Sequence, residues 1–284
     1  MGLGMDENIV WYPGHMAKAK RKMIECLSLV DIVIELLDAR LPLSSRNPDF
    51  LNIFANKPCI TLLTKSSLAD DNATDRWVKI LSADGRAVIP IDCKTKKNIN
   101  KIMPAVREQL KEKLARYEQK GMNKIIRAMV VGITNVGKST FINTFTCTRK
   151  AKAEDRPGVT RSNQWILSDK GIEFLDTPGV LWHKFDDRQT GVKLACTGAI
   201  RDQVLDMTGL SLELLELLRN GYPHLLTERY KTEPLPDESA YDLFERIAKK
   251  RGFIRSGGVI DEDRCASILL DEFRAGKIGK ITLD

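Results

Sequence analysis

The sequence predicts an α/β domain, built on a mostly parallel sheet with helices on both faces, followed by an all-α C-terminal domain. Up to Trp182, short apolar runs typical of buried strands alternate with segments of helical periodicity. Beyond Trp182 the strand-like runs stop and only helical patterns follow. A chain of 284 residues suits about two domains. We therefore expect the α/β domain at residues 1–185 and the helical domain at residues 186–284.

The individual elements follow from the spacing of apolar residues. Residues 16–30 predict an amphipathic helix, because Met23, Cys26 and Val30 share one face. Residues 99–117 predict a second helix, with a basic outer face. The apolar runs predict strands at residues 31–37, 59–63, 87–91, 125–131 and 171–175. In the C-terminal part the patterns predict helices at residues 191–200, 211–219, 239–250 and 261–275, with breaks at Pro234, Pro236 and the glycine pair 257–258.

The segment GITNVGKS, residues 132–139, has the spacing of a phosphate-binding loop. It follows a predicted strand and opens the helix-prone segment 140–145, which is the context such a loop requires. Its backbone N–H groups can surround phosphate oxygens, and the helix N-terminus adds positive potential. Lys138 would reach the β- and γ-phosphates, and the Ser139 hydroxyl would ligate Mg²⁺. We predict a nucleoside triphosphate site formed by Asn135, Val136, Gly137, Lys138, Ser139 and Thr140.

A second motif narrows the class of nucleotide-binding protein. The predicted strand at residues 171–175 is followed by the turn DTPG, which runs from Asp176 to Gly179. There Asp176 can hold a Mg²⁺-bound water, while the N–H of Gly179 can meet the γ-phosphate. Thr160 lies between the two motifs and could complete the Mg²⁺ shell. Asp176 follows Ser139 by 37 residues, which indicates a switch-type GTPase rather than a small-molecule kinase.

The base-reading motifs of such a GTPase lie upstream of the phosphate-binding loop instead of downstream. One predicted strand ends in Thr64, Lys65, Ser66 and Ser67, at the place of an Asn-Lys-x-Asp turn. The next ends in Asp92, Cys93 and Lys94, at the place of a Ser-Ala-Lys-like loop. The motif order is therefore base, base, phosphate, switch, switch. This order predicts a circularly permuted P-loop GTPase domain, because permutation moves the chain ends without removing a strand from the sheet.

Three further stretches carry a resemblance to a known family. They are WYPGHMAKA at residues 11–19, DAR at 38–40 with SSRNP at 44–48, and RSGG at 255–258. With the motifs above, they resemble the bacterial ribosome biogenesis GTPase A (RbgA/YlqF) family over essentially the whole chain. The resemblance implies a GTPase that acts late in assembly of the large (50S) ribosomal subunit and is stimulated by the particle. It implies GTP and Mg²⁺ as cofactors, and as partner the large subunit or its precursor, with its rRNA and ribosomal proteins.

The same resemblance implies how water is activated. Many GTPases place a glutamine directly after the DxxG glycine, whereas this chain has Val180, which cannot hydrogen-bond a water. In the family the histidine of the Pro-Gly-His motif takes this role, and that residue is His15 here. An imidazole can orient or deprotonate water near neutral pH. We therefore expect His15 to be catalytic; the alternative is an ordinary loop histidine.

Asn135 suggests a monovalent cation. An asparagine at this place in the phosphate-binding loop resembles GTPases that bind K⁺ between that side chain and the phosphates. The ion would supply positive charge where an arginine finger otherwise sits. The alternative is an asparagine tolerated in a tight turn.

The base-reading turn departs from the family pattern at Ser67. The aspartate of the family accepts two hydrogen bonds from guanine, each worth about 1.5–3 kcal/mol for a charged acceptor. A serine hydroxyl replaces at most one of them, so we predict weaker discrimination between bases. Asp70 and Asp71 lie a turn further on and are not expected to compensate, while the Cys93 N–H could still meet guanine O6. The alternative function is therefore a nucleotide-gated rRNA-binding assembly factor with weak hydrolysis or relaxed base specificity.

Composition and charge are compatible with an RNA partner. The net charge is +7 overall, but residues 186–284 carry 15 Lys/Arg against 18 Asp/Glu, so the positive charge lies in the first domain. Residues 18–22 form the densest basic cluster, and residues 94–124 form a second, which can equally be a solvated helix face. RNA or ribosome contact by residues 186–284 is therefore implied by the resemblance and not by charge.

The apolar runs and the cysteines indicate the compartment in which the protein works. No apolar run reaches the ~18 residues of a membrane helix, and the N-terminus lacks a signal-like apolar core. The six cysteines show no CxxC and no metal-ligand spacing, which predicts scattered buried thiols in a reducing compartment. We expect a cytoplasmic monomer with no membrane partner.

Overall fold

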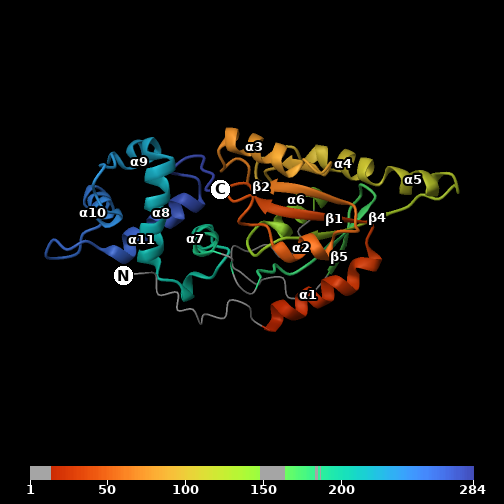
Figure 1. Ribbon diagram of the computed structural model, residues 1–284, viewed down its shortest axis with the longest axis horizontal. Coiled ribbons are helices and arrows are strands. Elements are labelled where there is room, and N and C mark those ends of the chain that lie inside the picture. The colour runs from red at the N-terminus through yellow and green to blue at the C-terminus, as the bar shows by residue number, and fades with distance from the viewer. Residues whose placement is uncertain (1–13, 148–163, 183–184, 186) are drawn as a thin grey trace. The chain divides into compact units, whose positions relative to one another are not determined.

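The computed structural model describes residues 14–147, 164–182, 185 and 187–284, and these fall into two compact units: the residues up to 182 together with Asp284, and residues 185–283. In its described part the first unit contains a six-stranded sheet in the order β3-β2-β1-β4-β6-β5 (Figure 1). The strands are β1 Ile32–Asp38, β2 Cys59–Thr64, β3 Ala87–Pro90, β4 Ile126–Val131, β5 Gln164–Leu167 and β6 Ile172–Asp176. The predicted fold class, an α/β domain followed by a helical one, is confirmed.

All neighbouring strands are parallel except β5, which pairs antiparallel with β6 at the edge. The carboxyl ends of the five parallel strands therefore meet at one edge of the sheet. Strand β5 was not predicted, because four residues at a sheet edge leave too short a pattern to recognise. The other five strands form where the apolar runs predict them. Strand β1 is buried along its whole length, as a central parallel strand should be.

Helix α3 packs on the face of this sheet that carries Leu37 and Leu63, whereas α6 packs on the opposite face, against Phe174 of β6. Helices therefore lie on both faces of the sheet (Figure 1). They are α1 Gly14–Cys26, α2 Pro48–Ile53, α3 Asp71–Leu81, α4 Ile102–Gln109, α5 Lys111–Glu118 and α6 Lys138–Thr146, with 3-10 turns at Leu27–Leu29 and Ile99–Lys101. The single helix predicted over residues 99–117 is wrong. The chain breaks at buried Leu110, whose backbone has left the helical region and whose N–H is shared between carbonyls of the preceding turn.

Helix α6, which follows the phosphate-binding loop, is anchored by aromatic packing. The rings of Phe141 and Phe145 meet the ring of Phe174 on β6 edge to face, at centroid distances of 5.7 and 5.2 Å. All three side chains are fully buried. Such contacts stabilise by about 0.5–1.5 kcal/mol each beyond the buried area. The start of α6 is therefore held firmly against the strand that ends in Asp176.

The second unit is helical in its described residues. Its helices are α7 Arg188–Cys196, α8 Met207–Gly221, α9 Pro223–Tyr230, α10 Ala240–Lys250 and α11 Glu262–Arg274, with a 3-10 turn at Asp202–Val204. Helix α8 packs against α7, α10 and α11 through buried Leu210, Leu214 and Leu218. The four predicted helices form with shifted ends, whereas α9 was not predicted, although Pro223 at its first position is a known start signal.

One buried carboxylate joins three helices of this unit. The carboxylate of Glu272 on α11 accepts from Arg229 Nε at 2.9 Å, from the Tyr230 hydroxyl at 2.9 Å and from Arg251 at 3.2 Å. These partners come from α9 and from the end of α10, so one carboxylate fixes three helices. No helix among the described residues is long and apolar enough to span a membrane.

Candidate nucleotide-binding site

The predicted site residues gather where the parallel strands end. Strand β4 leads through the loop 132–137 into α6, β6 ends at Asp176, and β2 and β3 end next to the two predicted base-reading segments. Because these strands are neighbours in one parallel arrangement, their following loops lie at the same edge of the sheet. The permuted motif order thus rebuilds a single site in space.

The phosphate-binding loop has the backbone that its sequence requires. Gly137 precedes α6 with a φ of 102°, a conformation that favours glycine. Asn135 is left-handed at a φ of 55°, which asparagine tolerates better than most residues. The N–H groups in the first turn of a helix point away from its carbonyls, so those of α6 can donate to an anion. The loop therefore offers donors to phosphate oxygens.

Lys138 is folded over this loop. Its Nζ donates to the carbonyl oxygens of Gly132 at 3.0 Å and Ile133 at 2.7 Å, and its side chain is buried. Burial lowers the pKa of Lys138 to about 8, although the charge of Asp176 opposes the shift. An amine held by two neutral carbonyls can exchange them for phosphate oxygens, which carry a full negative charge.

Asp176 and Ser139 fit a magnesium site. The Ser139 hydroxyl donates to Asp176 Oδ2 at 3.3 Å, so two of the three predicted Mg²⁺ residues are in contact. The other carboxylate oxygen, Oδ1, is buried and has no hydrogen-bond partner among the described residues. Burial raises the pKa of Asp176 despite Lys138 and Ser139. An unsatisfied buried oxygen beside a hydroxyl is the donor set that a hard divalent cation takes, directly or through water.

The turn after Asp176 packs directly on the phosphate-binding loop. A Cβ at Gly179 would lie 2.8 Å from backbone atoms of Thr134 and 3.0 Å from Lys138 Nζ, so only glycine fits. The Val180 side chain is completely buried, and its carbonyl oxygen accepts from Asn47 Nδ2 at 3.1 Å. Val180 therefore contributes packing and cannot orient a water. The contact with Asn47 was not predicted; Asn47 also caps helix α2.

The first base-reading loop is bound to the phosphate-binding loop by two side chains. The Thr64 hydroxyl lies 2.7 Å from the carbonyl oxygen of Val136 and 3.0 Å from that of Leu37. Lys65 Nζ donates to the carbonyl oxygen of Asn135 at 2.7 Å and to Asp38 at 3.0 Å. Threonine at the first motif position thus retains a side-chain link between the loops.

Asp38, at the end of β1, holds the Lys65 side chain that contacts the phosphate-binding loop. Its carboxylate accepts from Arg40 Nε at 2.9 Å and from the second guanidinium nitrogen at 2.8 Å, in addition to Lys65. Burial favours the neutral acid, but Arg40 and Lys65 outweigh it and hold the pKa of Asp38 far below its usual range. The ion pair between Asp38 and Arg40 was not predicted. A charged residue at the end of a buried strand was the feature of the sequence that could have indicated it.

The second base-reading loop contacts the first. Ser67 Oγ donates to Asp92 Oδ2, and the N–H of Ser66 donates to the carbonyl oxygen of Ile91 at 3.1 Å. Ser66 Oγ is buried without a hydrogen-bond partner among the described residues. Burial, with the nearby charge of Asp92, raises the pKa of Cys93 to about 11, so its thiol is neutral.

Two predicted residues are not placed. Thr160 lies outside the described residues. The backbone of His15 lies in the first turn of α1, but its side chain is not described. The prediction of buried cysteines is confirmed for Cys59, Cys196 and Cys265. It is wrong for Cys147, which is exposed after the end of α6, and Cys26 and Cys93 are only half-buried. No cluster of three potential metal-ligating side chains occurs in the part of the chain that the structure describes.

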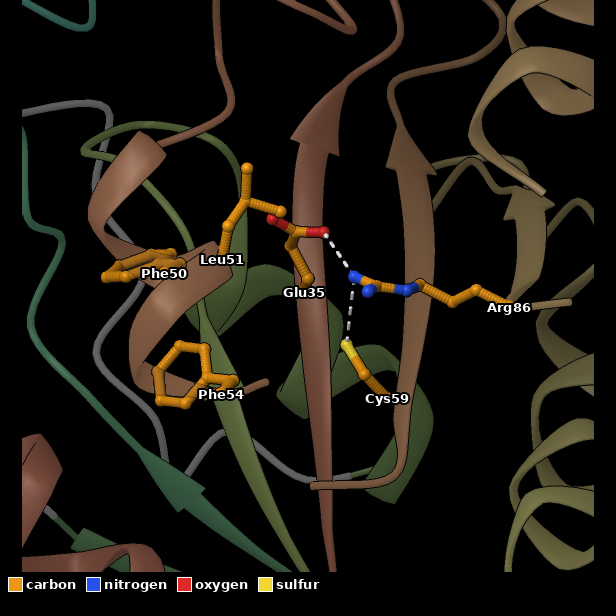
Figure 2. Close-up of a pocket in the computed structure, with 6 residues that line it drawn as sticks. All are labelled: Glu35, Phe50, Leu51, Phe54, Cys59 and Arg86. Atoms are coloured by element: carbon orange, nitrogen blue, oxygen red, sulfur yellow. Dashed lines mark hydrogen bonds and ion pairs between the residues drawn. The ribbon is translucent and has the colours of Figure 1, made fainter. Parts of the chain in front are cut away.

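A pocket on the first unit lies apart from these loops and is lined by Glu35, Phe50, Leu51, Phe54, Cys59 and Arg86 (Figure 2). Glu35 accepts from Arg46 and from Thr61, and Arg86 lies 3.8 Å from it. Burial and the charge of Glu35 raise the pKa of Cys59 to about 12, so this thiol is not a nucleophile. The pocket contains internally satisfied ion pairs and none of the predicted site residues.

A phosphate-binding loop, a DxxG turn and two base-reading loops, brought together in permuted order, define a circularly permuted P-loop GTPase. The family model described as "50S ribosome-binding GTPase" matches residues 127–224. It begins in β4 and omits the base-reading loops, which here precede it.

Whole-chain comparisons extend the match. The chain is 44% identical to Ribosome biogenesis GTPase A of Bacillus cereus over 97% of this chain and 93% of that protein. It is 46% identical to the protein of the same name from Priestia megaterium, over 97% and 96%. The crystal structure of GNP-bound YlqF from Thermotoga maritima superimposes with a TM-score of 0.65 at 25% identity, covering 94% of this chain and 97% of that one. The chain belongs to the ribosome biogenesis GTPase A family and is a GTP hydrolase.

Proposed function

We propose that this GTPase acts in the biogenesis of the large (50S) ribosomal subunit, at a late stage, and that the particle stimulates its GTP hydrolysis. The observation that supports the nucleotide chemistry is the grouping of Lys138, Ser139 and Asp176 at one sheet edge, joined to the first base-reading loop through Thr64 and Lys65. The names of the relatives supply the ribosomal context.

The residues of the phosphate-binding loop would contact different parts of the triphosphate. The N–H groups at the start of α6 bind the phosphate oxygens, while Lys138 leaves the carbonyl oxygens of Gly132 and Ile133 to neutralise the β- and γ-phosphates. Ser139 and Asp176 would hold Mg²⁺, with Thr160 as a third contributor. When bound, that ion neutralises charge on the β- and γ-phosphate oxygens.

Water activation needs a group other than Val180, because that side chain is apolar and buried. We assign this role to His15, which would act when the protein is docked on the particle. Asn135, at the bend of the phosphate-binding loop, would hold K⁺ against the phosphates and so supply positive charge. The same absence of a water-orienting side chain at Val180 favours the second candidate, a nucleotide-gated rRNA-binding factor with weak hydrolysis.

The basic residues of α1 are our candidate for ribosomal RNA contact. Lys18, Arg21 and Lys22 are exposed on this helix, whereas Lys20 pairs with Asp49 at 2.7 Å. In the second basic cluster, Lys113 and Lys124 both pair with buried Asp31, at 2.6 and 3.2 Å. Part of that second cluster thus serves the fold, which makes α1 the better polyanion site. We further propose that the protein works as a cytoplasmic monomer.

Co-sedimentation with purified large subunits and their precursors, with hydrolysis measured in parallel, tests this function. We expect binding favoured by GTP and a raised hydrolysis rate on the particle. Replacing Lys18, Arg21 and Lys22 with glutamine should weaken binding and lower its log–log salt slope by roughly two. The matched control replaces Lys101, Arg107 and Lys111, which are exposed on the region of α4 and α5.

The outcomes separate the two candidates. GTP-dependent binding without any stimulation of hydrolysis would support the assembly factor with weak hydrolysis instead. Absence of binding to subunits and precursors at every salt concentration would overturn both.

A further inference from the structure

The two base-reading loops meet at a single side-chain pair. Strands β2 and β3 are parallel neighbours, so the loops that follow them emerge side by side. One backbone hydrogen bond, from the N–H of Ser66 to the carbonyl oxygen of Ile91, joins them. Directly beyond it, the Ser67 hydroxyl donates to Asp92 Oδ2. The contact joins the last residue of the first motif to the first residue of the second.

The residue types at these two positions are exchanged relative to the motif patterns. An Asn-Lys-x-Asp turn would place aspartate at position 67, and a Ser-Ala-Lys-like loop would place serine at position 92. This chain has serine at 67 and aspartate at 92. The contacting pair therefore still contains one carboxylate and one hydroxyl, on opposite loops. The carboxylate missing from the first loop is present one side chain away.

The two oxygens of Asp92 are used unequally. Oδ1 accepts from the N–H of Lys94 at 2.8 Å, the N–H of Thr95 at 2.9 Å and the Thr95 hydroxyl at 3.3 Å. Among the described residues, Oδ2 accepts only from Ser67. A carboxylate oxygen has two lone-pair sites, so Oδ2 retains the capacity to accept a further N–H. Oδ1 thus builds the turn, and Oδ2 is the oxygen with acceptor capacity left.

The Asp92 side chain is charged and held in place. Its residue is buried, which favours the neutral acid, but the hydrogen bonds from Ser67, Thr95 and Lys94 prevail and lower the pKa of Asp92. An ionised carboxylate that accepts N–H bonds matches guanine, whose N1–H and N2–H₂ are adjacent donors. Adenine presents an acceptor at N1 and gives no such match.

We infer that Asp92 is the specificity-determining residue for guanine in this chain, and that Ser67 positions it. This inference rests on the proposed nucleotide site, and it changes the base specificity that we expect of that site. The serine at position 67 does not relax base specificity, because the reading carboxylate has moved to the neighbouring loop.

Competition titrations of a fluorescent GTP analogue by GTP, ITP, XTP and ATP test the assignment. ITP lacks the N2 amino group, and XTP carries a carbonyl oxygen in its place. Wild-type protein should prefer GTP over ITP by at least about tenfold, the value of one charge-assisted bond. Asp92→Ser should remove most of this preference by weakening GTP binding more than ITP binding, because only GTP offers the N2 amino group to the carboxylate.

A variant that restores the usual motif residues, aspartate at position 67 and serine at position 92, gives the most direct test. Ser67→Asp alone brings two carboxylates into contact and should weaken GTP binding, whereas Ser67→Asp with Asp92→Ser should restore the GTP preference. Asp92→Asn keeps an oxygen for the turn but offers an N–H where Oδ2 stood, so it should gain affinity for XTP and lose it for GTP. Asp84→Ser, on the exposed segment before β3, is the matched control.

The results decide between clear cases. A GTP preference that survives both Asp92→Ser and Asp92→Asn would overturn the inference, as would tighter GTP binding by Ser67→Asp alone. If Asp92→Ser does not fold, the change from GTP to XTP in Asp92→Asn still decides. Should wild-type protein bind no nucleoside triphosphate, the proposed site itself fails, which is a different result from loss of selectivity.

Discussion

The hydroxyl of Thr64 lies 2.7 Å from the carbonyl oxygen of Val136, and it binds the end of strand β2 to the phosphate-binding loop. Both residues are buried, and the Val136 carbonyl oxygen is the nearer of the two acceptors of this hydroxyl, the other being that of Leu37 at 3.0 Å. The contact fixes how far the base-reading loop stands from the loop that holds phosphate. A nucleotide that spans both loops is sensitive to this distance.

Thr64→Val should therefore weaken nucleotide binding although position 64 need not touch the base. Valine keeps the shape of the side chain but has no hydroxyl. The buried Val136 carbonyl oxygen then loses this hydrogen bond, at a cost of about 1–3 kcal/mol. Part of that cost should appear as roughly five- to thirtyfold weaker GTP binding in calorimetric titration. Thr64→Ser retains the hydroxyl and is the control. Equal affinities of wild type and Thr64→Val would show that the loop spacing does not depend on this bond.

Asp38→Asn should destabilise the fold. It leaves the Arg40 guanidinium buried against an uncharged partner, a change that typically costs about 3–5 kcal/mol. Because the folded pKa of Asp38 is lowered, its contribution is present above the unfolded pKa near 3.9 and is lost as the pH falls below it. Urea unfolding should show a wild-type advantage at pH 7 that shrinks toward pH 3. Asp84→Asn, on an exposed loop, should show no comparable difference at either pH.

The lowered pKa of Lys138 predicts how nucleotide affinity depends on pH. Its pKa is lowered to about 8 in the free protein, and bound phosphate would raise it again. Binding thus takes up a proton above pH 8, so GDP affinity should be flat from pH 7 to 8 and fall by up to about tenfold per pH unit beyond. Titrations between pH 7 and 9 measure this slope. Lys138→Arg cannot titrate there, and a wild-type slope in that variant would assign the effect to another group.

The sequence allowed most of the first unit to be predicted because its motifs are local. The phosphate-binding loop, the DxxG turn and their flanking strands depend on a few adjacent residues, and permutation changes only their order. The helix predicted over residues 99–117 failed because Leu110 is buried at a bend, a tertiary effect that periodicity does not contain. Strand β5 failed because an edge strand of four residues has almost no pattern of its own.

The side-chain contacts of the site were harder to foresee than its motifs. Asn47 and Val180 are 133 residues apart in the chain, and only folding brings them together. The pairing of Ser67 with Asp92 also crosses between loops, so a substitution that looks like a loss in one motif is matched by a change in another. Motif spacing identifies which loops meet, but not which side chains share a hydrogen bond across them.

Replacing K⁺ with Na⁺ at constant ionic strength should depress hydrolysis if Asn135 holds the larger ion, by roughly tenfold or more if the charge matters in the transition state. Asn135→Ala should erase the difference between the two salts. Because Asn135 is left-handed, Asn135→Gly is the better-matched variant, since it removes the side chain without backbone strain. Identical wild-type rates in both salts would leave Asn135 with its turn-forming role alone.

His15→Ala should leave nucleotide binding intact and lower particle-stimulated hydrolysis by at least about tenfold, within the ~10²–10⁴ range of a general base. The reason is that Val180, buried and apolar, cannot supply the water-orienting group. His15→Gln can still orient a water but cannot take its proton, so it should give an intermediate rate. His224→Ala, exposed on α9, is the matched control. Single-turnover hydrolysis on large subunits measures all four proteins, and equal rates for wild type and His15→Ala would remove His15 from the chemistry.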